Sequence, residues 1–367
     1  MTLQRPILLA AGGTGGHLFP AESLALALAV RGYAVELATD TRALKYGAAF
    51  PARAIHAVPA ATPTSGSLLS KGLAALVLAR GILAARSLIK RLRPLAVVGF
   101  GGYPTVPPLL AATQLKVPTV LHEQNAVMGR ANRFLAGRVS AIGTGFPNLG
   151  GVDAAIQAKA HFTGNPVRPA VLTAADLSYP LQSDGRLRLL ITGGSQGARV
   201  MSEILPPAVE LLDAARRARL SIVQQARGED AAAVAAAYKR ISVSADIKPF
   251  FNDLPNQIAC AHLIIARAGA STVSELAVIG RAAILVPFPH ALDQDQAANA
   301  AVLAMTGAVT VVKQADFTPQ WLAAALALAL DDPAGLKARA LAAKAAGVRD
   351  AAERLVDLVL RVAGLTQ

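Results

Sequence analysis

Cysteine, aromatic residues and acidic charge are all scarce in this sequence. Cys260 is the only cysteine among 367 residues, which excludes an intrachain disulfide and a cysteine-based zinc site and fits a reducing compartment. Aromatic residues make up 4% of the chain against a hydrophobic content of 53%, so Leu, Val, Ile and Ala must form the core. This composition argues against disorder, and the length suggests two domains of the usual ~100–200 residues.

The shortage of acidic residues leaves the chain strongly basic. Lys and Arg number 36 against 23 Asp and Glu, a net charge of +13, which indicates a polyanionic partner such as nucleic acid, an anionic membrane or a phosphorylated substrate. Nucleic-acid binding usually needs aromatic side chains among the basic ones, and the chain has only one Trp and five Tyr. We therefore predict a membrane or phosphate partner and no nucleic acid. Arg5 and Pro6 lead directly into a short strand and a glycine loop, so no signal peptide is expected.

One local pattern occurs twice along the chain. Residues 5–11 are typical of an apolar strand and precede the loop GGTGGH and a helix; residues 186–191 repeat the strand and precede GGSQGA and a helix. The loops begin at Gly12 and Gly193, which are 193 − 12 = 181 residues apart, a domain's length. We predict two parallel α/β domains in tandem, with a proline-containing linker near 165–185.

The loop GGTGGH is predicted to cradle a phosphate. Its small residues let backbone N–H groups approach an anion, whereas Leu18 stands where a dinucleotide fingerprint needs its third glycine, which argues against an NAD-dependent oxidoreductase. His17, at the start of the following helix, is a candidate general base because its ordinary pKa lies near neutrality. A second loop, GFGGYP, contains Gly101 and Gly102, and the two loops together could hold a pyrophosphate.

A polar cluster ends the predicted strand 117–122. His122, Glu123 and Asn125 follow one another at its carboxyl end, and three polar groups in four positions indicate a site. Glu123 is the alternative general base, and the residues themselves do not decide between it and His17.

Residues 264–300 are predicted to bind a sugar nucleotide. The stretch is typical of a buried strand, a turn at Gly269, a helix, a second strand and a polar loop. In such a unit the ligand lies beyond the carboxyl ends of the strands, against helix N-termini that favour phosphate. Polar residues crowd the two positions where the ligand would lie: Ser271, Thr272, Ser274 and Glu275, then Asp293, Gln294, Asp295, Gln296 and Asn299.

Some of these residues also have the spacing of a helix cap. Thr272 with Glu275, and Asp293 with Gln296, fit an N-cap residue and its partner three positions later. Asp293-Gln-Asp295 also resembles the D-x-D of metal-dependent sugar transferases, but the pattern is common and no other carboxylate cluster supports it. We predict no metal site and no cofactor.

Residues 65–93 are apolar with interspersed cations. Arg80 and Arg86 interrupt any uncharged run of the ~18 residues needed to span a bilayer, so we predict that the segment does not cross one. Two roles remain open: a core helix with a solvated basic edge, or a surface that lies on anionic lipid with its Leu and Ile side chains inserted.

Nearly from end to end, the chain resembles the MurG family of bacterial N-acetylglucosaminyltransferases. The motifs that carry the resemblance are GGTGGHLFPA, GFGGYPTVPPLLAA, LHEQNAVMGRANR, TGNPVR, GGSQGA, RAGASTVSE and D-x-x-Q-x-x-N-A. The resemblance implies the GT-B fold, an α/β fold of two Rossmann-like parallel-sheet domains facing across a cleft. Residues 1–165, completed by a C-terminal helix at about 347–367, would form the acceptor domain, and residues 166–346 the UDP-GlcNAc-binding domain.

The family transfers GlcNAc from UDP-GlcNAc to the C4 hydroxyl of MurNAc in lipid I, with inversion, giving lipid II and UDP in peptidoglycan synthesis. Positions matching its substrate contacts are Thr14, Gly15 and Gly16 in the first loop; Asn125, Arg168 and Ser195 at the donor sugar and phosphates; Phe251 at uracil; Ala270, Ser271, Thr272 and Glu275 at phosphates and ribose; and Asp295, Gln296 and Asn299 at GlcNAc. Gly13, Gly101, Gly102 and Tyr103 are expected at the acceptor pyrophosphate. Asp295 departs from the Gln or His more usual in the family.

The resemblance also implies a peripheral protein at the cytoplasmic face of the cell membrane. Expected partners are UDP-GlcNAc, lipid I, an anionic membrane surface through residues 65–93, and the cell-wall and division machinery. The rivals are a GT-B transferase with a soluble acceptor, the related UDP-GlcNAc 2-epimerase, and a non-catalytic scaffold of the cell-wall machinery. The segment 65–93 argues against the first two, and the polar donor-site residues argue against the scaffold.

Overall fold

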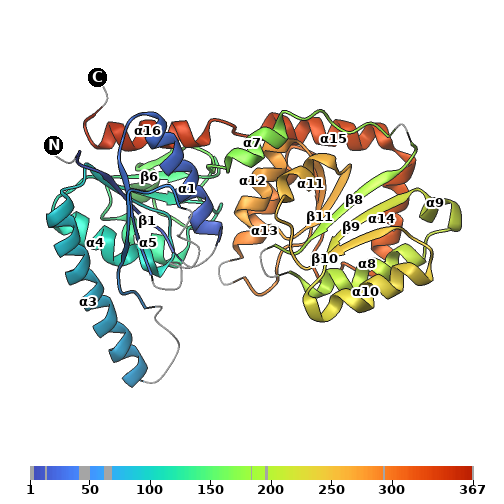
Figure 1. Ribbon diagram of the computed structural model, residues 1–367, viewed down its shortest axis with the longest axis horizontal. Helices are drawn as coiled ribbons and strands as arrows, with labels where there is room; N and C mark the ends of the chain where they lie inside the picture. Colours follow the sequence, from blue (N-terminus) through green and yellow to red (C-terminus); the bar gives the residue numbers. More distant parts are fainter. Residues whose placement is uncertain are drawn as a thin grey trace. The chain divides into compact units, whose positions relative to one another are not determined.

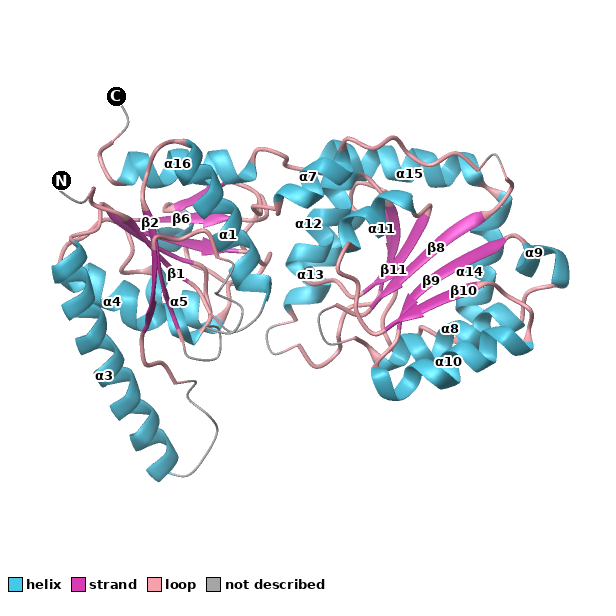
Figure 2. Cartoon of the chain, in the orientation of Figure 1, coloured by secondary structure: helices cyan, strands magenta, loops and turns pink. Residues whose placement is uncertain are grey.

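Each of two units of the chain is organised around a parallel sheet (Figures 1 and 2). The computed structural model describes residues 4–12, 15–40, 50–61, 68–182, 184–194, 197–291 and 294–365. The first unit comprises residues 1–168 and 349–367, and the second comprises residues 169–348. The predicted boundaries at 165 and about 347 lie three and two residues earlier (168 − 165 and 349 − 347).

The sheet of the first unit has the strand order β3-β2-β1-β4-β5-β6-β7. Its strands are β1 (Ile7–Ala10), β2 (Val35–Thr39), β3 (Ala54–Ala57), β4 (Ala96–Gly99), β5 (Thr119–Glu123), β6 (Ala141–Thr144) and β7 (Ala160–Phe162). Successive side chains of a strand point to opposite faces, and both faces are apolar because helices cover both. Ile7 and Leu9 therefore belong to one core cluster and Leu8 to another.

The helices of the first unit divide between these two faces. They are α1 (Gly15–Val30), α3 (Leu68–Leu92), the 3-10 turn η1 (Tyr103–Thr105), α4 (Val106–Gln114), α5 (Arg130–Ala136), α6 (Ala154–Gln157) and α16 (Ala351–Val362). α1 and α16 pack on the face of Ile7 and Leu9, whereas α3, α4 and α5 pack on the face of Leu8. α16 returns the end of the chain to the first unit through buried Leu355, Val356 and Val359.

The sheet of the second unit has the order β10-β9-β8-β11-β12-β13. Its strands are β8 (Leu187–Thr192), β9 (Leu220–Gln225), β10 (Ala245–Lys248), β11 (Leu263–Ala266), β12 (Ala282–Leu285) and β13 (Val309–Val311). Its helices are α7 (Pro169–Ala175), α8 (Arg199–Glu210), α9 (Ala214–Ala218), α10 (Gly228–Arg240), α11 (Leu254–Cys260), α12 (Ala270–Ile279), α13 (Asp295–Ala304), α14 (Pro319–Asp331) and α15 (Pro333–Ala346). α8, α10 and α14 share one core cluster with β8, while α12 contacts α7, α11, α13 and α15.

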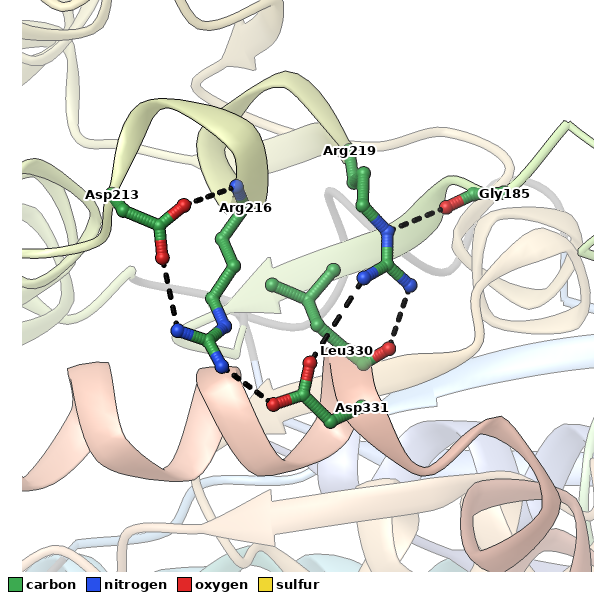
Figure 3. A network of polar contacts seen from close by, with 6 residues as sticks. All are labelled: Gly185, Asp213, Arg216, Arg219, Leu330 and Asp331. Carbon is green, nitrogen blue, oxygen red and sulfur yellow. Dashed lines mark hydrogen bonds and ion pairs between the residues drawn. The ribbon is translucent and has the colours of Figure 1, made fainter.

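A surface network fastens the short helix α9 to the end of α14 (Figure 3). Arg216 donates to Asp213 at 2.9 Å and to Asp331 at 2.7 Å, and Arg219 donates to two backbone carbonyl groups nearby. These side chains are about half exposed, so water and salt screen the ion pairs and each contributes little to stability. The network thus orients α9 more than it stabilises the unit.

The segment predicted to be an amphipathic helix forms α3. Between Gly72 and Leu92, a stretch of 21 residues, α3 contains an 18-residue window with a mean hydropathy of 1.7, and 22% of this window is buried. By length and composition alone, it is the one helix among the described residues that could cross a membrane. Because length and composition do not test whether a helix crosses, the absence of a crossing at α3 stays a prediction.

The two halves of α3 differ in their packing. In the second half, Leu88 and Ile89 are buried in the core of the first unit, and the backbone of Gly81 lies directly against the carbonyl of Pro59. In contrast, Leu73 and Leu76 in the first half are exposed. The helix thus presents apolar side chains that this unit does not cover.

Candidate functional site

The structure brings His17 against the second glycine loop of the first unit. His17 lies in the first turn of α1 and is partly exposed. A Cβ added to Gly101 would lie 3.3 Å from His17 Cδ2, and one added to Gly102 would lie 3.6 Å from Cε1. Thr105 Oγ1 holds this loop by donating to the carbonyls of Gly101 at 2.6 Å and Ala10 at 3.2 Å. Burial lowers the pKa of His17 below 6.5, so the ring is neutral at pH 7 and able to accept a proton.

Glu123, the alternative base, is buried and holds the loop that follows β5. Its side chain is 1% exposed. Oε1 accepts from Asn125 N at 2.9 Å and Nδ2 at 3.3 Å, and Oε2 accepts from Gly129 N at 3.0 Å and Asn132 Nδ2 at 2.7 Å. Burial raises the pKa of Glu123, and these hydrogen bonds offset part of the rise. Both carboxylate oxygens are therefore engaged by the protein's own loop.

His122 is a structural residue beside this carboxylate. It is fully buried; Nε2 donates to the carbonyl of Gly164 at 3.1 Å, and Nδ1 accepts from Gln124 Nε2 at 3.1 Å. A carbonyl can only accept, so Nε2 must carry the proton. Burial lowers the pKa of His122 to about 4, against the opposite effect of the bond to Gly164. The neutral ring joins β5 to the segment that leads out of the first unit.

Arg168, the last residue before the chain enters the second unit, packs against α1. Its guanidinium carbon is 4.3 Å from the centroid of the Phe19 ring, and its charge lowers the pKa of Glu22 against the larger, upward effect of burial. Phe19 in turn lies under Gly15, where an added Cβ would be 2.9 Å from the ring. The structure thus brings Arg168 next to the helix that begins at the first glycine loop.

In the second unit, the glycine loop after β8 is held by Gln225. Gln225 Oε1 accepts from Gly193 N and from Thr192 Oγ1, both at 3.0 Å. The backbone of Gly193 lies so close to the nitrogen of Ala198 that no Cβ would fit, and Gly194 and Gly197 have φ values of 83° and 68°, which favour glycine. The described glycines of this loop therefore form a close turn, and its role as a phosphate cradle stays a prediction.

The start of α12 differs from the prediction. The helix begins at Ala270, and its N-cap is Gly269, which forms no side-chain capping bond. The predicted capping box of Thr272 and Glu275 is therefore wrong, because Thr272 already lies in the first helical turn. The first-turn N–H groups of a helix have no partner within it, and here Ala270, Ser271 and Thr272 supply them. They form a positive end suited to an anion, and Glu275 follows in the second turn, buried.

Gln296 and Asn299 brace the loops that follow β11 and β12. Gln296 Oε1 accepts from Ala268 N at 3.2 Å and from Phe288 N at 3.0 Å, and Asn299 Nδ2 donates to the carbonyl of Ala268 at 3.2 Å. The helix α13 begins at Asp295 with Gln294 as its N-cap; the predicted cap residue Asp293 lies outside the described residues. Both amides thus position backbone around the start of α12.

The remaining predicted site residues have the following locations. The Phe251 side chain is buried, and Tyr103 begins η1 beside Gly102. Gly16 lies in the first turn of α1. Gly13, Thr14, Ser195 and Asp293 lie outside the described residues. Within the described ranges, no group of three or more His, Cys, Asp or Glu side chains could hold a metal ion.

Comparison with known proteins identifies the family. The model of the glycosyltransferase family 28 N-terminal domain matches residues 7–144, and that of the C-terminal domain matches residues 188–355. The chain belongs to glycosyltransferase family 28. A family-28 relative from Methylobacterium sp. (strain 4-46) is 59% identical over 99% of this chain and 98% of its own length. It is named UDP-N-acetylglucosamine--N-acetylmuramyl-(pentapeptide) pyrophosphoryl-undecaprenol N-acetylglucosamine transferase.

Solved structures agree with this assignment. The crystal structure of Acinetobacter baumannii MurG matches with a TM-score of 0.79 and 30% identity, over 97% of this chain and 99% of that chain. The predicted resemblance and the GT-B fold are thereby confirmed. UDP-GlcNAc 2-epimerase from Neisseria meningitidis matches with a TM-score of 0.67 at 16% identity, over 96% of this chain and 99% of that chain, a likeness that shows the fold alone.

Two buried polar residues that hold the loops of this candidate site are not among the residues predicted from the sequence. Gln225 is 4% exposed and ends β9, and Asn132 is 2% exposed on α5. Gln225 could have been found, because it ends a strand at the carboxyl edge just as Glu123 does. A lone Asn inside a helix carries no such signal.

Replacing Gly101 by alanine should displace His17. Gly101 has a φ of 85°, and the new Cβ would lie 3.2 Å from Asn132 and 3.3 Å from His17. We expect a kcat at least ~10-fold lower, equal to about 1.4 kcal/mol, with UDP affinity retained, as measured by steady-state kinetics and calorimetry. Gly137→Ala is the control, since its φ is −64° and an added Cβ meets nothing within 4 Å. An unchanged kcat for Gly101→Ala would contradict a catalytic role for this contact.

Proposed function

We propose that this protein transfers GlcNAc from UDP-GlcNAc to the C4 hydroxyl of MurNAc in lipid I, releasing UDP and forming lipid II for peptidoglycan synthesis. The observation that carries the proposal is the 59% identity, over 99% of the chain, to a relative named for this transfer. The two parallel-sheet units and their glycine loops provide the groups that the reaction needs.

The second unit would bind the donor. The diphosphate would lie against the N–H groups of Ala270, Ser271 and Thr272 and against the loop from Gly193 to Gly197. Backbone N–H groups directed at the departing UDP stabilise its growing negative charge without rearranging. Glu275 would accept hydrogen bonds from the ribose hydroxyls. With Arg168 as a further cation, we expect the reaction to need no bound metal.

The first unit would activate the acceptor through His17. An inverting transfer needs a base to remove the proton of the attacking hydroxyl. His17 is partly exposed, and burial keeps it neutral at pH 7. Glu123 is 1% exposed, and both its oxygens already accept hydrogen bonds. We therefore assign the base to His17 and assign to Glu123 the positioning of Asn125.

Helix α3 would set the first unit on an anionic membrane, where a lipid-linked acceptor is confined. Leu73, Leu76 and Leu83 are 64%, 51% and 67% exposed. Lys90 and Arg91, at the end of the same helix, are exposed as well. Exposed leucines combined with cations on one helix suit a surface that inserts between lipids and attracts anionic headgroups.

The reaction is tested by UDP release from UDP-GlcNAc with purified protein, with and without a short-chain lipid I analogue. We expect UDP release to depend on the analogue, because the hydroxyl that displaces UDP belongs to the acceptor. UDP release without the analogue would instead indicate an epimerase or a hydrolytic relative. Binding of UDP-GlcNAc without any release would indicate the scaffold.

The choice of base is tested by pH–rate profiles of two variants. A base must be unprotonated, and the pKa of His17 is lowered, so kcat/KM should rise with pH and level off with a midpoint below pH 6.5. His17→Gln should lose about 10²–10⁴-fold in rate, whereas Glu123→Asp should be slower but keep the same acid limb. An acid limb that survives in His17→Gln and moves in Glu123→Asp would assign the base to Glu123.

Membrane binding is tested by replacing Leu73, Leu76 and Leu83 together with serine. Moving a leucine side chain out of water is favourable by up to about 1.5–3 kcal/mol of free energy. Because serine loses this contribution, binding to phosphatidylglycerol-containing vesicles should weaken at least ~10-fold. The control replaces Leu328 and Leu341, which are 71% and 58% exposed in the second unit. Equal binding of the triple variant and the control would contradict the role of α3. Extraction by alkaline carbonate should release the wild type, whereas a crossing helix would resist.

A further inference from the structure

Arg281 is a fully buried cation that the proposed reaction does not use. It follows Gly280, the C-cap residue of α12, and is 1% exposed. Its guanidinium forms no ion pair with any carboxylate of the described residues; it donates only to backbone carbonyls. Nε and Nη2 donate to Ala259, Nη1 donates to Ile279 at 3.1 Å and Gly280 at 2.8 Å, and Nη2 also donates to Ser178 at 3.4 Å.

Two helix ends neutralise this charge. Ala259 lies in the last turn of α11, and Ile279 and Gly280 end α12. The carboxyl end of a helix carries about −0.5 elementary charge, so two such ends offset about one cation. The Tyr179 ring, 5.4 Å from the guanidinium carbon, adds a further favourable contact. Arg281 thus locks α11, α12 and the segment around Ser178 into one arrangement.

The segments that connect the second unit to the first lie on the same end of α12. Ser178 and Tyr179 follow α7, which begins where the chain leaves the first unit. Lys344 Nζ donates to the carbonyl of Ala175 at 2.9 Å, and its stem packs on Gly280. At the other connection, a Cβ on Gly347 would lie 2.6 Å from the carbonyl oxygen of Ala277. Both connecting segments therefore rest on the carboxyl half of α12.

The amino end of α12 carries the proposed donor contacts. A helix of 10 residues is a rod about 15 Å long, so a group that fixes one end also sets the position of the other. We propose that Arg281 is a positioning residue for the donor: it holds α12 where the N–H groups of Ala270 to Thr272 meet the diphosphate, and it couples donor binding to the two connecting segments. The proposal rests on the donor site proposed above.

The experiment compares conservative variants of two arginines of the second unit, the buried Arg281 and the partly buried Arg339. Arg281→Lys keeps the charge but loses the fork of donors that joins two helix ends. Arg339→Lys is the matched control, because Arg339 is also held by carbonyls of the same unit, those of Ala283 and Ala308. Glu275→Ala reports on the donor site itself. Each protein is assayed for thermal stability, for the Kd of UDP by calorimetry, and for the KM of UDP-GlcNAc and of the acceptor analogue.

We expect Arg281→Lys to raise the Kd of UDP and the KM of UDP-GlcNAc about 10-fold, a change of about 1.4 kcal/mol, with the KM of the acceptor unchanged. Arg339→Lys should lower stability without this selective effect. An Arg281→Lys protein that is destabilised but binds UDP like the wild type, while Glu275→Ala binds weakly, would overturn the positioning role alone. A wild type that does not bind UDP would overturn both this role and the donor site.

Hydrogen exchange on the wild type tests the coupling without any variant. Bound UDP should slow amide exchange at residues 177–179 and 345–348. These two segments pack against the carboxyl half of α12, away from the proposed donor contacts. Protection confined to Ala270–Glu275 and the loop after β8 would overturn the coupling.

Discussion

The site depends on loops that pack so closely against neighbouring atoms that only glycine fits at certain positions. A Cβ on Gly12 would lie 2.7 Å from the Pro104 ring, so Gly12 lies directly against the second glycine loop. In the second unit, Gly193 lies directly against Ala198. Side chains at these positions would push the loops apart and move the first turns of the helices that follow. A parallel sheet brings such loops to one edge, and glycine lets them pack there.

The surplus of basic residues has an internal use as well as an external one. Arg281 is buried, and Arg267 and Arg339 are partly buried, each donating to carbonyls of the second unit. Burial lowers the pKa of all three side chains, but an arginine stays charged because its ordinary pKa is so high. Part of the net charge of +13 therefore neutralises helix and strand ends inside the protein. The bulk charge alone overstates the surface that is available to an anionic partner.

Glu123 illustrates how far a sequence can locate a site without assigning its chemistry. A carboxylate at the carboxyl end of a strand has the right position for a base. Its neighbours, which include Asn132 nine positions later, occupy both oxygens and leave it a positioning role. The start of α12 is similar: the helix was predicted, but a capping box requires the helix to begin after Thr272, and the turn at Gly269 starts it earlier.

The sequence by itself determined the two α/β units, the glycine loops and the polar ends of the strands, because these follow from local periodicity and from residues a few positions apart. It also determined the family, since its motifs stand in one order along the chain. Only the tertiary structure decided which groups meet: His17 with Gly101, and Arg281 with Ser178 and Ala259. Those pairs are far apart in the chain. Their contact depends on how helices pack on a sheet, which no short stretch of sequence specifies.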